Sequence, residues 1–203
     1  MEFITLTLVF IDMKKLLMII VTICTCLSVY GQTSHLSFKG VPIDGTLSHY
    51  VQAMRQKGFT LVKTGKGEAI LRGDFAGIKG CEVGVYTLDA MDLVSNIGVI
   101  FPSQITWARL ESDYKALKGN LIDKYGRPSE CVEKFDDRYV DDDNDRLHAL
   151  KFDKCHYYTI WSTELGDIEL SLQRDEVLHC YVFLKYYDRI NGNAVQDVIM
   201  EDL

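Results

Sequence analysis

The sequence predicts an α+β protein in which helices cover an antiparallel sheet. One observation is a clear amphipathic helix at residues 104–125, QITWARLESDYKALKGNLIDKY. A second is that strand-like runs lie on both sides of this helix, separated by short gaps that suit hairpins. A third is the element order, helix plus four strands, which occurs twice and suggests two similar halves without residue identity between them.

Residues 1–31 are predicted to be a signal peptide, with Met13 as the true initiator. Lys14 and Lys15 precede a short apolar run at residues 16–23, and Val29 and Gly31 are small residues that suit cleavage before Gln32. The expected mature chain, residues 32–203, is then periplasmic or secreted. It forms a single α+β domain or two similar halves, residues 32–103 and 104–203.

Two membrane-bound alternatives fit this N-terminal segment less well. One long anchor through residues 3–30 would be interrupted by Asp12, Lys14 and Lys15. A lipoprotein needs a small residue before its modified cysteine, whereas Cys24 follows Ile23 and Cys26 follows Thr25. We therefore expect no stable membrane span after cleavage.

The first half contains a short strand at 35–39, a turn at 40–45 and a helix that begins near Thr46 and ends at Gly58. Leu47, Tyr50, Val51 and Met54 have helical spacing. Strand-like runs follow at residues 60–63, 68–75, 82–88 and 96–101, with glycine-rich or aspartate-rich gaps between them.

The second half begins with the helix at 104–125. Ser103 is expected to cap its start, and Gly126 followed by Pro128 is expected to end it. Its apolar stripe consists of Trp107, Leu110, Tyr114, Leu117, Leu121 and Tyr125.

Strand-like runs follow the helix at residues 130–135, 156–163, 167–173 and 179–187. The run 167–173 alternates as a half-exposed strand does. The last run is apolar on both faces, so it is expected to be central in the sheet or to bind something on one face.

Three stretches, FKGVPIDGTL at 38–47, DYKALKGNLIDKYGRPSECVEKF at 113–135 and CYVFLKYYDRIN at 180–191, resemble a family of uncharacterised secreted proteins from Bacteroides-like gut bacteria. The resemblance covers most of the mature chain. It implies an exported protein and carries no activity with it.

The cysteines that remain after cleavage are an even number in a chain expected in an oxidising compartment, which favours disulfides. They are Cys81, Cys131, Cys155 and Cys180. Cys131 and Cys155 flank the acidic segment and are the preferred pair. Buried free thiols, a metal site or a catalytic thiol are the alternatives.

The acidic segment at residues 136–146 is predicted to be a solvated, mobile loop. Asp141, Asp143 and Asp145 match the first three ligands of a calcium loop. Arg146 and Phe152 replace the glycine and glutamate that the loop requires, so an EF-hand is excluded and only an irregular calcium site stays open.

Five aromatic residues are candidates for a ligand-binding platform on the sheet. They are Tyr157, Trp161, Tyr181, Phe183 and Tyr187. Flat amphipathic rings anchor both sugars and protein partners. The sequence favours the other interpretation, in which these rings form the core beneath the helices, because the helical stripes must pack on large apolar residues.

The chain has 22 basic and 29 acidic residues, a net charge of −7, which argues against nucleic acid as a partner. It contains no nucleophile elbow, zinc-protease motif, phosphate loop or dinucleotide fingerprint, so no cofactor and no catalytic residue are assigned.

The favoured function is an exported, non-enzymatic module that binds a protein or a carbohydrate. The alternative is a hydrolase whose site combines dispersed Cys, His and Asp residues. The element order is similar to that of cystatin-like or β-lactamase-inhibitor-like modules, an analogy that does not transfer function.

Overall fold

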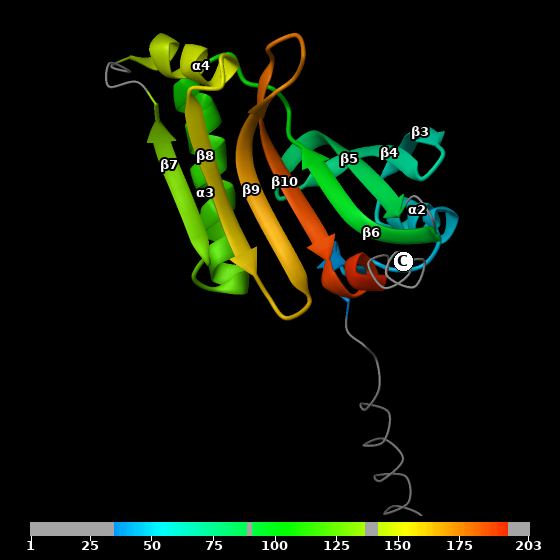
Figure 1. The fold of residues 1–203 in the computed structure, drawn as a ribbon. Coiled ribbons are helices and arrows are strands. Elements are labelled where there is room, and N and C mark those ends of the chain that lie inside the picture. The colour runs from blue at the N-terminus through cyan, green and yellow to red at the C-terminus, as the bar shows by residue number, and fades with distance from the viewer. Residues whose placement is uncertain (1–34, 89–90, 137–141, 195–203) are drawn as a thin grey trace, which may run out of the picture. The chain divides into compact units, whose positions relative to one another are not determined.

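The computed structural model describes residues 35–88, 91–136 and 142–194; the predicted signal peptide lies outside these residues. It confirms an α+β fold with a large antiparallel sheet (Figure 1). The elements are β1 (Ser37–Phe38), β2 (Val41–Pro42), α2 (Leu47–Gln56), β3 (Thr60–Gly65), β4 (Glu68–Phe75), β5 (Ile78–Leu88), β6 (Met91–Ile100), α3 (Trp107–Tyr125), β7 (Glu130–Phe135), α4 (Asp143–Lys151), β8 (Cys155–Ser162), β9 (Gly166–Arg174) and β10 (Cys180–Asp188).

Strands β3 to β10 form one eight-stranded sheet with the order β3-β4-β5-β6-β10-β9-β8-β7. Each half of the chain supplies a meander of four strands, and the two meanders join where β6 and β10 pair in antiparallel fashion. The order helix plus four strands occurs twice, as the sequence predicts, with α4 added between β7 and β8. Strand β10, apolar on both faces, occupies a central position in the sheet.

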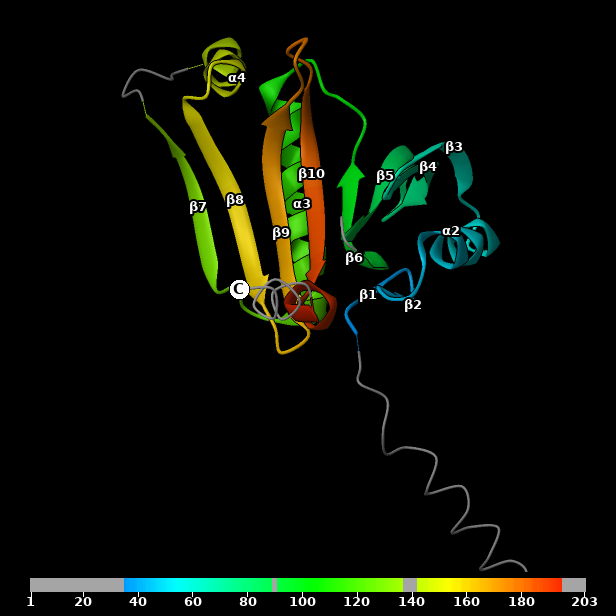
Figure 2. The same ribbon diagram turned by 45° about the vertical axis from the view of Figure 1, so that its right-hand side comes forward.

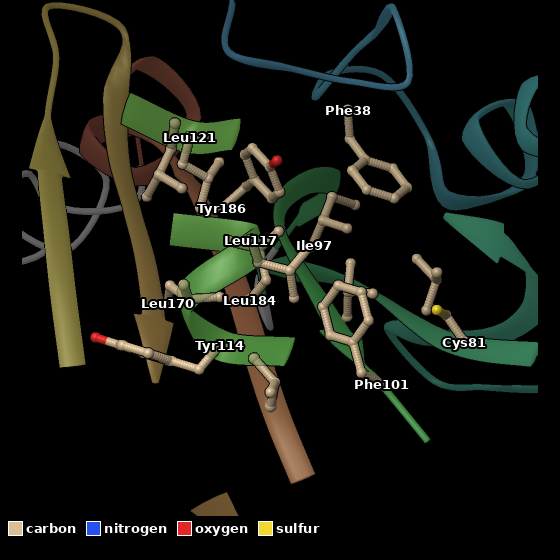
Figure 3. Packing of buried hydrophobic residues seen from close by; sticks show 14 of the residues in the cluster. Phe38, Cys81, Ile97, Phe101, Tyr114, Leu117, Leu121, Leu170, Leu184 and Tyr186 are labelled. Carbon is tan, nitrogen blue, oxygen red and sulfur yellow. The ribbon is translucent and has the colours of Figure 1, made fainter. Parts of the chain in front are cut away.

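One face of the sheet forms the core beneath the helices. Directly paired residues on successive strands are all buried there: Leu71, Val83, Val99, Leu184, Leu170 and Thr159. Helix α2 contacts β4, β5 and β6, and α3 contacts β9 and β10 (Figure 2). Leu117 and Leu121 of α3 lie beside Leu184 and Tyr186 of β10 (Figure 3). Residues of both halves therefore share one hydrophobic core.

Helix α3 begins at Trp107, and its N-cap is Thr106 rather than the predicted Ser103. The reason is a bridge between Gln104 and Cys180, in which the Gln104 amide donates to the Cys180 carbonyl at 2.8 Å and keeps this segment extended. The helix ends as predicted at Gly126, whose φ of 80° favours glycine.

Helix α4 corrects the prediction of an acidic loop over residues 136–146. Residues 137–141 lie outside the described part of the chain, but Asp142 is an N-cap that accepts a hydrogen bond from the Asp145 amide at 2.8 Å. Aspartates are favoured at this position and in a first helical turn, because they complement the free amides and the helix dipole. Leu147 and Leu150 bury the inner side of the helix.

The β1–β2 hairpin is held by a buried polar node at the end of β10. The Asp188 side chain is fully buried and accepts hydrogen bonds from the backbone amides of Leu36, at 2.8 Å, and Asn191, at 3.0 Å. The Asn191 amide donates to the carbonyls of Ile43 and Val94. The node thus pairs a buried carboxylate with donors and ties the hairpin to the sheet.

Candidate functional site

The sheet face opposite the core is covered by neither α2, α3 nor α4. We call it the open face. Its residues alternate with the core residues along each strand, so the register defines it: the row next to the buried one contains Glu130, Ile160, Glu169, Lys185, Gly98, Gly84 and Ile70. Within the described residues, this face is the main surface of the sheet that these three helices leave uncovered.

The open face carries a cluster of partly exposed aromatic rings, which we call the open-face cluster. Its members are Tyr86, Tyr158, Tyr181, Phe183 and Tyr187. Tyr86 is 41% exposed, and Ile100, which pairs with Phe183, is 37% exposed. Large rings that stay accessible on one face are a feature of binding surfaces rather than of a monomer's ordinary surface.

Two glycines fix how two of these rings lie. Gly84 and Gly98 pair directly on β5 and β6 and are buried. A Cβ added to Gly84 would lie 2.5 Å from the Tyr86 hydroxyl, and one added to Gly98 would lie 3.0 Å from Cζ of Phe183. The Tyr86 and Phe183 rings therefore lie directly over the glycine backbone, and together they cover the open face where the two halves meet.

The five aromatics proposed from the sequence are divided between the two faces. Tyr181, Phe183 and Tyr187 lie on the open face, whereas Tyr157 and Trp161 lie on the side of the sheet that α3 covers, Trp161 in the core and Tyr157 partly buried against it. Trp161 is 1% exposed, and its indole donates to the Gly126 carbonyl at 2.9 Å. The five residues thus do not form one platform.

Tyr157 packs against α3 and the end of β7. Its ring lies 5.1 Å from that of Trp107 at an interplanar angle of 84° and 5.8 Å from that of Tyr114. Its hydroxyl donates to Glu111 at 3.4 Å. Burial and the Glu111 carboxylate raise the pKa of Tyr157 to about 12. This ring is partly buried and packs against the core on the helix-covered side of the sheet, so it does not belong to the open-face cluster.

Tyr86 and Tyr158 belong to the open-face cluster but were not proposed from the sequence. Tyr158 pairs with Ser171, which pairs with Phe183, so all three lie in one row. The Tyr158 hydroxyl donates to Glu130 at 2.7 Å, and this hydrogen bond raises the pKa of Tyr158. The alternation of Glu82, Gly84 and Tyr86 was the signal that could have identified Tyr86.

Two open depressions lie on the open face along β10. The larger, which we call the β7–β10 depression, has a volume of about 540 Å³ and is lined by Ser129, Glu130, Ile160, Ser162, Asp167, Glu169, Lys185 and Tyr187. The smaller, of about 290 Å³, includes Ile100, Glu82 and Tyr181. Phe183 lies between them on β10. The surface is therefore broad and shallow.

The prediction of a disulfide is wrong, both for the preferred Cys131–Cys155 pair and for the expectation that the cysteines are oxidised. Cys81, Cys131, Cys155 and Cys180 are free thiols, and all but Cys131 are buried. Cys131 pairs with Thr159 on β8, four residues along the strand from Cys155. That offset is about 13 Å along a strand, well beyond the reach of a disulfide.

The thiols and histidines that the hydrolase alternative would combine are also separated. The Cys155 thiol faces the core, and burial raises its pKa to about 12, while His156 lies on the open face with Nε2 2.9 Å from an Asp136 oxygen. His179 lies just before β10, and its Nδ1 contacts Asp175 at 2.9 Å. Within the described ranges, neither histidine is paired with a thiol that it could activate.

The calcium candidates are also separated. Asp141 lies outside the described residues, and Asp143 and Asp145 are exposed in the first turn of α4. Residues two apart on a helix point to different sides, so these carboxylates do not converge. No group of His, Cys, Asp or Glu in the described residues is arranged to hold a metal ion.

Comparisons of the chain with known protein families, with curated proteins and with solved structures find no match. None of the helices in the described part of the chain has the length and apolar character needed to cross a membrane.

Proposed function

We propose that the chain is an exported protein-binding module whose partner docks on the open face of the sheet. The observation that carries this proposal is the open-face cluster, a set of partly exposed rings on the side of the sheet that the helices leave uncovered. Export is supported by the lysine pair, apolar run and small residues of the first 31 positions.

The size of the surface supports a protein as the partner. Eight strands spaced about 4.8 Å apart span about 34 Å, and six residues of a strand extend about 20 Å, which gives roughly 700 Å². A standard protein interface covers about 800 Å² on each partner. Aromatic anchors surrounded by charged residues are also the usual composition of such an interface.

The pattern of exposed groups favours binding over hydrolysis. The open face presents rings and charged groups at its surface, while the thiols of Cys81, Cys155 and Cys180 are buried on the other side. A hydrolytic site needs a nucleophile and a base within hydrogen-bond reach. We therefore place a binding function ahead of the hydrolase alternative.

Three variants test the proposal. Phe183→Ser removes a central ring. Gly84→Ala does not change Tyr86 itself but displaces its ring, because the new Cβ would clash with the hydroxyl end of that ring. The matched control is Ile122→Ser, which removes an apolar side chain that is 39% exposed on α3, away from the sheet. Thermal melts establish that each variant is folded.

Immobilised wild-type protein and these variants are compared for proteins retained from an envelope or culture extract, identified by mass spectrometry. We expect at least one protein to be retained by wild type and by Ile122→Ser and to be lost with Phe183→Ser and Gly84→Ala. Equal retention by all four forms would contradict the proposal. A polysaccharide retained with the same variant dependence would assign a carbohydrate as the ligand instead.

A further inference from the structure

The β7–β10 depression has an unusual arrangement of charge. Glu130, Ile160, Glu169 and Lys185 form one cross-strand row on β7, β8, β9 and β10. The two glutamates lie on either side of Ile160, about 10 Å apart by strand spacing, and in this row the residue between them is the apolar Ile160. The row therefore places two like charges around an apolar side chain.

Neither glutamate is neutralised by an ion pair in the described residues. Glu130 accepts a hydrogen bond from the Tyr158 hydroxyl at 2.7 Å, which leaves its charge in place. Glu169 is directly opposite Lys185, yet this pair is not within salt-bridge distance. The third carboxylate of the depression, Asp167, is paired with Arg189 at 3.2 Å. The two glutamates are thus available to a charged ligand.

We infer that the partner of the open face presents an arginine side chain to the β7–β10 depression. This inference rests on the proposed protein-binding function and adds the chemistry of the partner. A guanidinium can lie flat on Ile160 and donate to Glu130 on one side and Glu169 on the other, because its donors spread in a planar fork. The Tyr187 ring in the same wall adds an aromatic surface of the kind on which guanidinium groups stack.

The balance of charge supports a cation over an anion. The lining contains Glu130, Asp167 and Glu169 against Lys185, and Arg189 beside it pairs with Asp167, so these groups together carry a net charge of −1. The whole chain is acidic as well, with a net charge of −7. Lys185 is exposed and can extend toward solvent or pair with a carboxylate that neighbours the arginine on the partner.

The test uses small probes with the folded protein, so it does not depend on knowing the partner. N-acetyl-L-arginine amide is titrated while backbone amide shifts are recorded by NMR, and N-acetyl-L-citrulline amide, which has the same shape without the charge, is the matched control. We expect the arginine probe to shift the amides of Ile160 and Glu169 with millimolar affinity and the citrulline probe to leave them unchanged.

Variants of the two glutamates then test whether they bind the arginine probe. Glu130→Gln and Glu169→Gln are each expected to weaken binding of the arginine probe by about tenfold, the effect of losing one charge-assisted hydrogen bond. Glu176→Gln, an exposed glutamate in the β9–β10 turn, is the control and should leave the affinity unchanged. Equal binding of both probes, or full affinity in Glu130→Gln and Glu169→Gln, would overturn the inference.

These results separate the two proposals. If the arginine probe fails while Phe183→Ser still loses a retained protein, the partner uses another chemistry and only this inference is wrong. If the arginine probe binds as expected but no protein depends on Phe183, the depression binds the cation as inferred and the proposed function is wrong.

Discussion

A buried hydrogen bond between helix and sheet offers a sharp test of how the second half is held together. Tyr114 of α3 and Thr159 of β8 are both fully buried, and their hydroxyl oxygens are 2.7 Å apart. Burial raises the pKa of Tyr114, so the phenol stays protonated and can donate. Thr159→Val keeps the shape of the side chain and removes its hydroxyl.

The expected loss of stability in each variant depends on the buried hydroxyl that remains without its partner. In Thr159→Val, the Tyr114 hydroxyl is buried without a partner, which costs about 1–3 kcal/mol. Tyr114→Phe leaves the Thr159 hydroxyl, which retains a contact with the Cys131 sulfur at 3.5 Å, so we expect a smaller loss of about 1 kcal/mol. The double variant replaces both polar groups by apolar ones and should lose much less than the sum.

Urea and thermal unfolding of the four proteins measure this coupling. For a domain of this size, 1 kcal/mol corresponds to roughly 2–4 °C in Tm, so Thr159→Val should melt up to about 10 °C below wild type. Additive losses in the double variant would refute the reasoning, since they would show that the two hydroxyls do not depend on each other.

Three further results are expected. Asp142→Ala should destabilise the protein by about 1 kcal/mol, because it removes the side chain that caps α4. Asp142→Asn keeps an equally good capping group and should melt like wild type, so equal melting temperatures of the two variants would contradict the capping role of Asp142. Native alkylation followed by peptide mapping should modify Cys131 but not Cys155, whose buried thiol has its pKa raised to about 12; labelling of Cys155 would contradict its burial. Burial raises the pKa of Asp44, but hydrogen bonds and His35 outweigh it and hold the pKa below its usual value. The ionised carboxylate of Asp44 therefore stabilises the folded state, fully above the unfolded-state pKa and progressively less as pH falls through the folded-state pKa. The difference in Tm between wild type and Asp44→Asn should shrink from pH 7 toward pH 3.

The elements that could be predicted are those whose signals are local. The start of α2 near Thr46, its apolar spacing and the end of α3 at Gly126 need only neighbouring residues to be recognised, and each is found in the structure. The alternation of residues 167–173 likewise predicts which side of β9 is buried. Helical and strand periods are properties of short windows, so one sequence is sufficient for them.

The features that could not be predicted depend on pairing between distant segments. The platform proposed from the sequence included Tyr157 where the structure presents Tyr158, and a shift of one residue moves a side chain to the opposite face. The expected Cys131–Cys155 bond fails for a similar reason, because the β7–β8 register offsets the two cysteines. Helix α4 was missed because its acidic first turn resembles a loop until the apolar residues that follow are included.

The open-face cluster depends on the pairing of the two halves. Tyr86 belongs to the first meander and Phe183 to the second, and they approach each other only because β6 pairs with β10. The same pairing places Gly98 beneath the Phe183 ring and aligns Ile100 with it. On the other side of the sheet, Val99 and Leu184 meet in the shared core. The contact that completes the core thus also assembles the surface to which we assign binding, so neither half alone would present it.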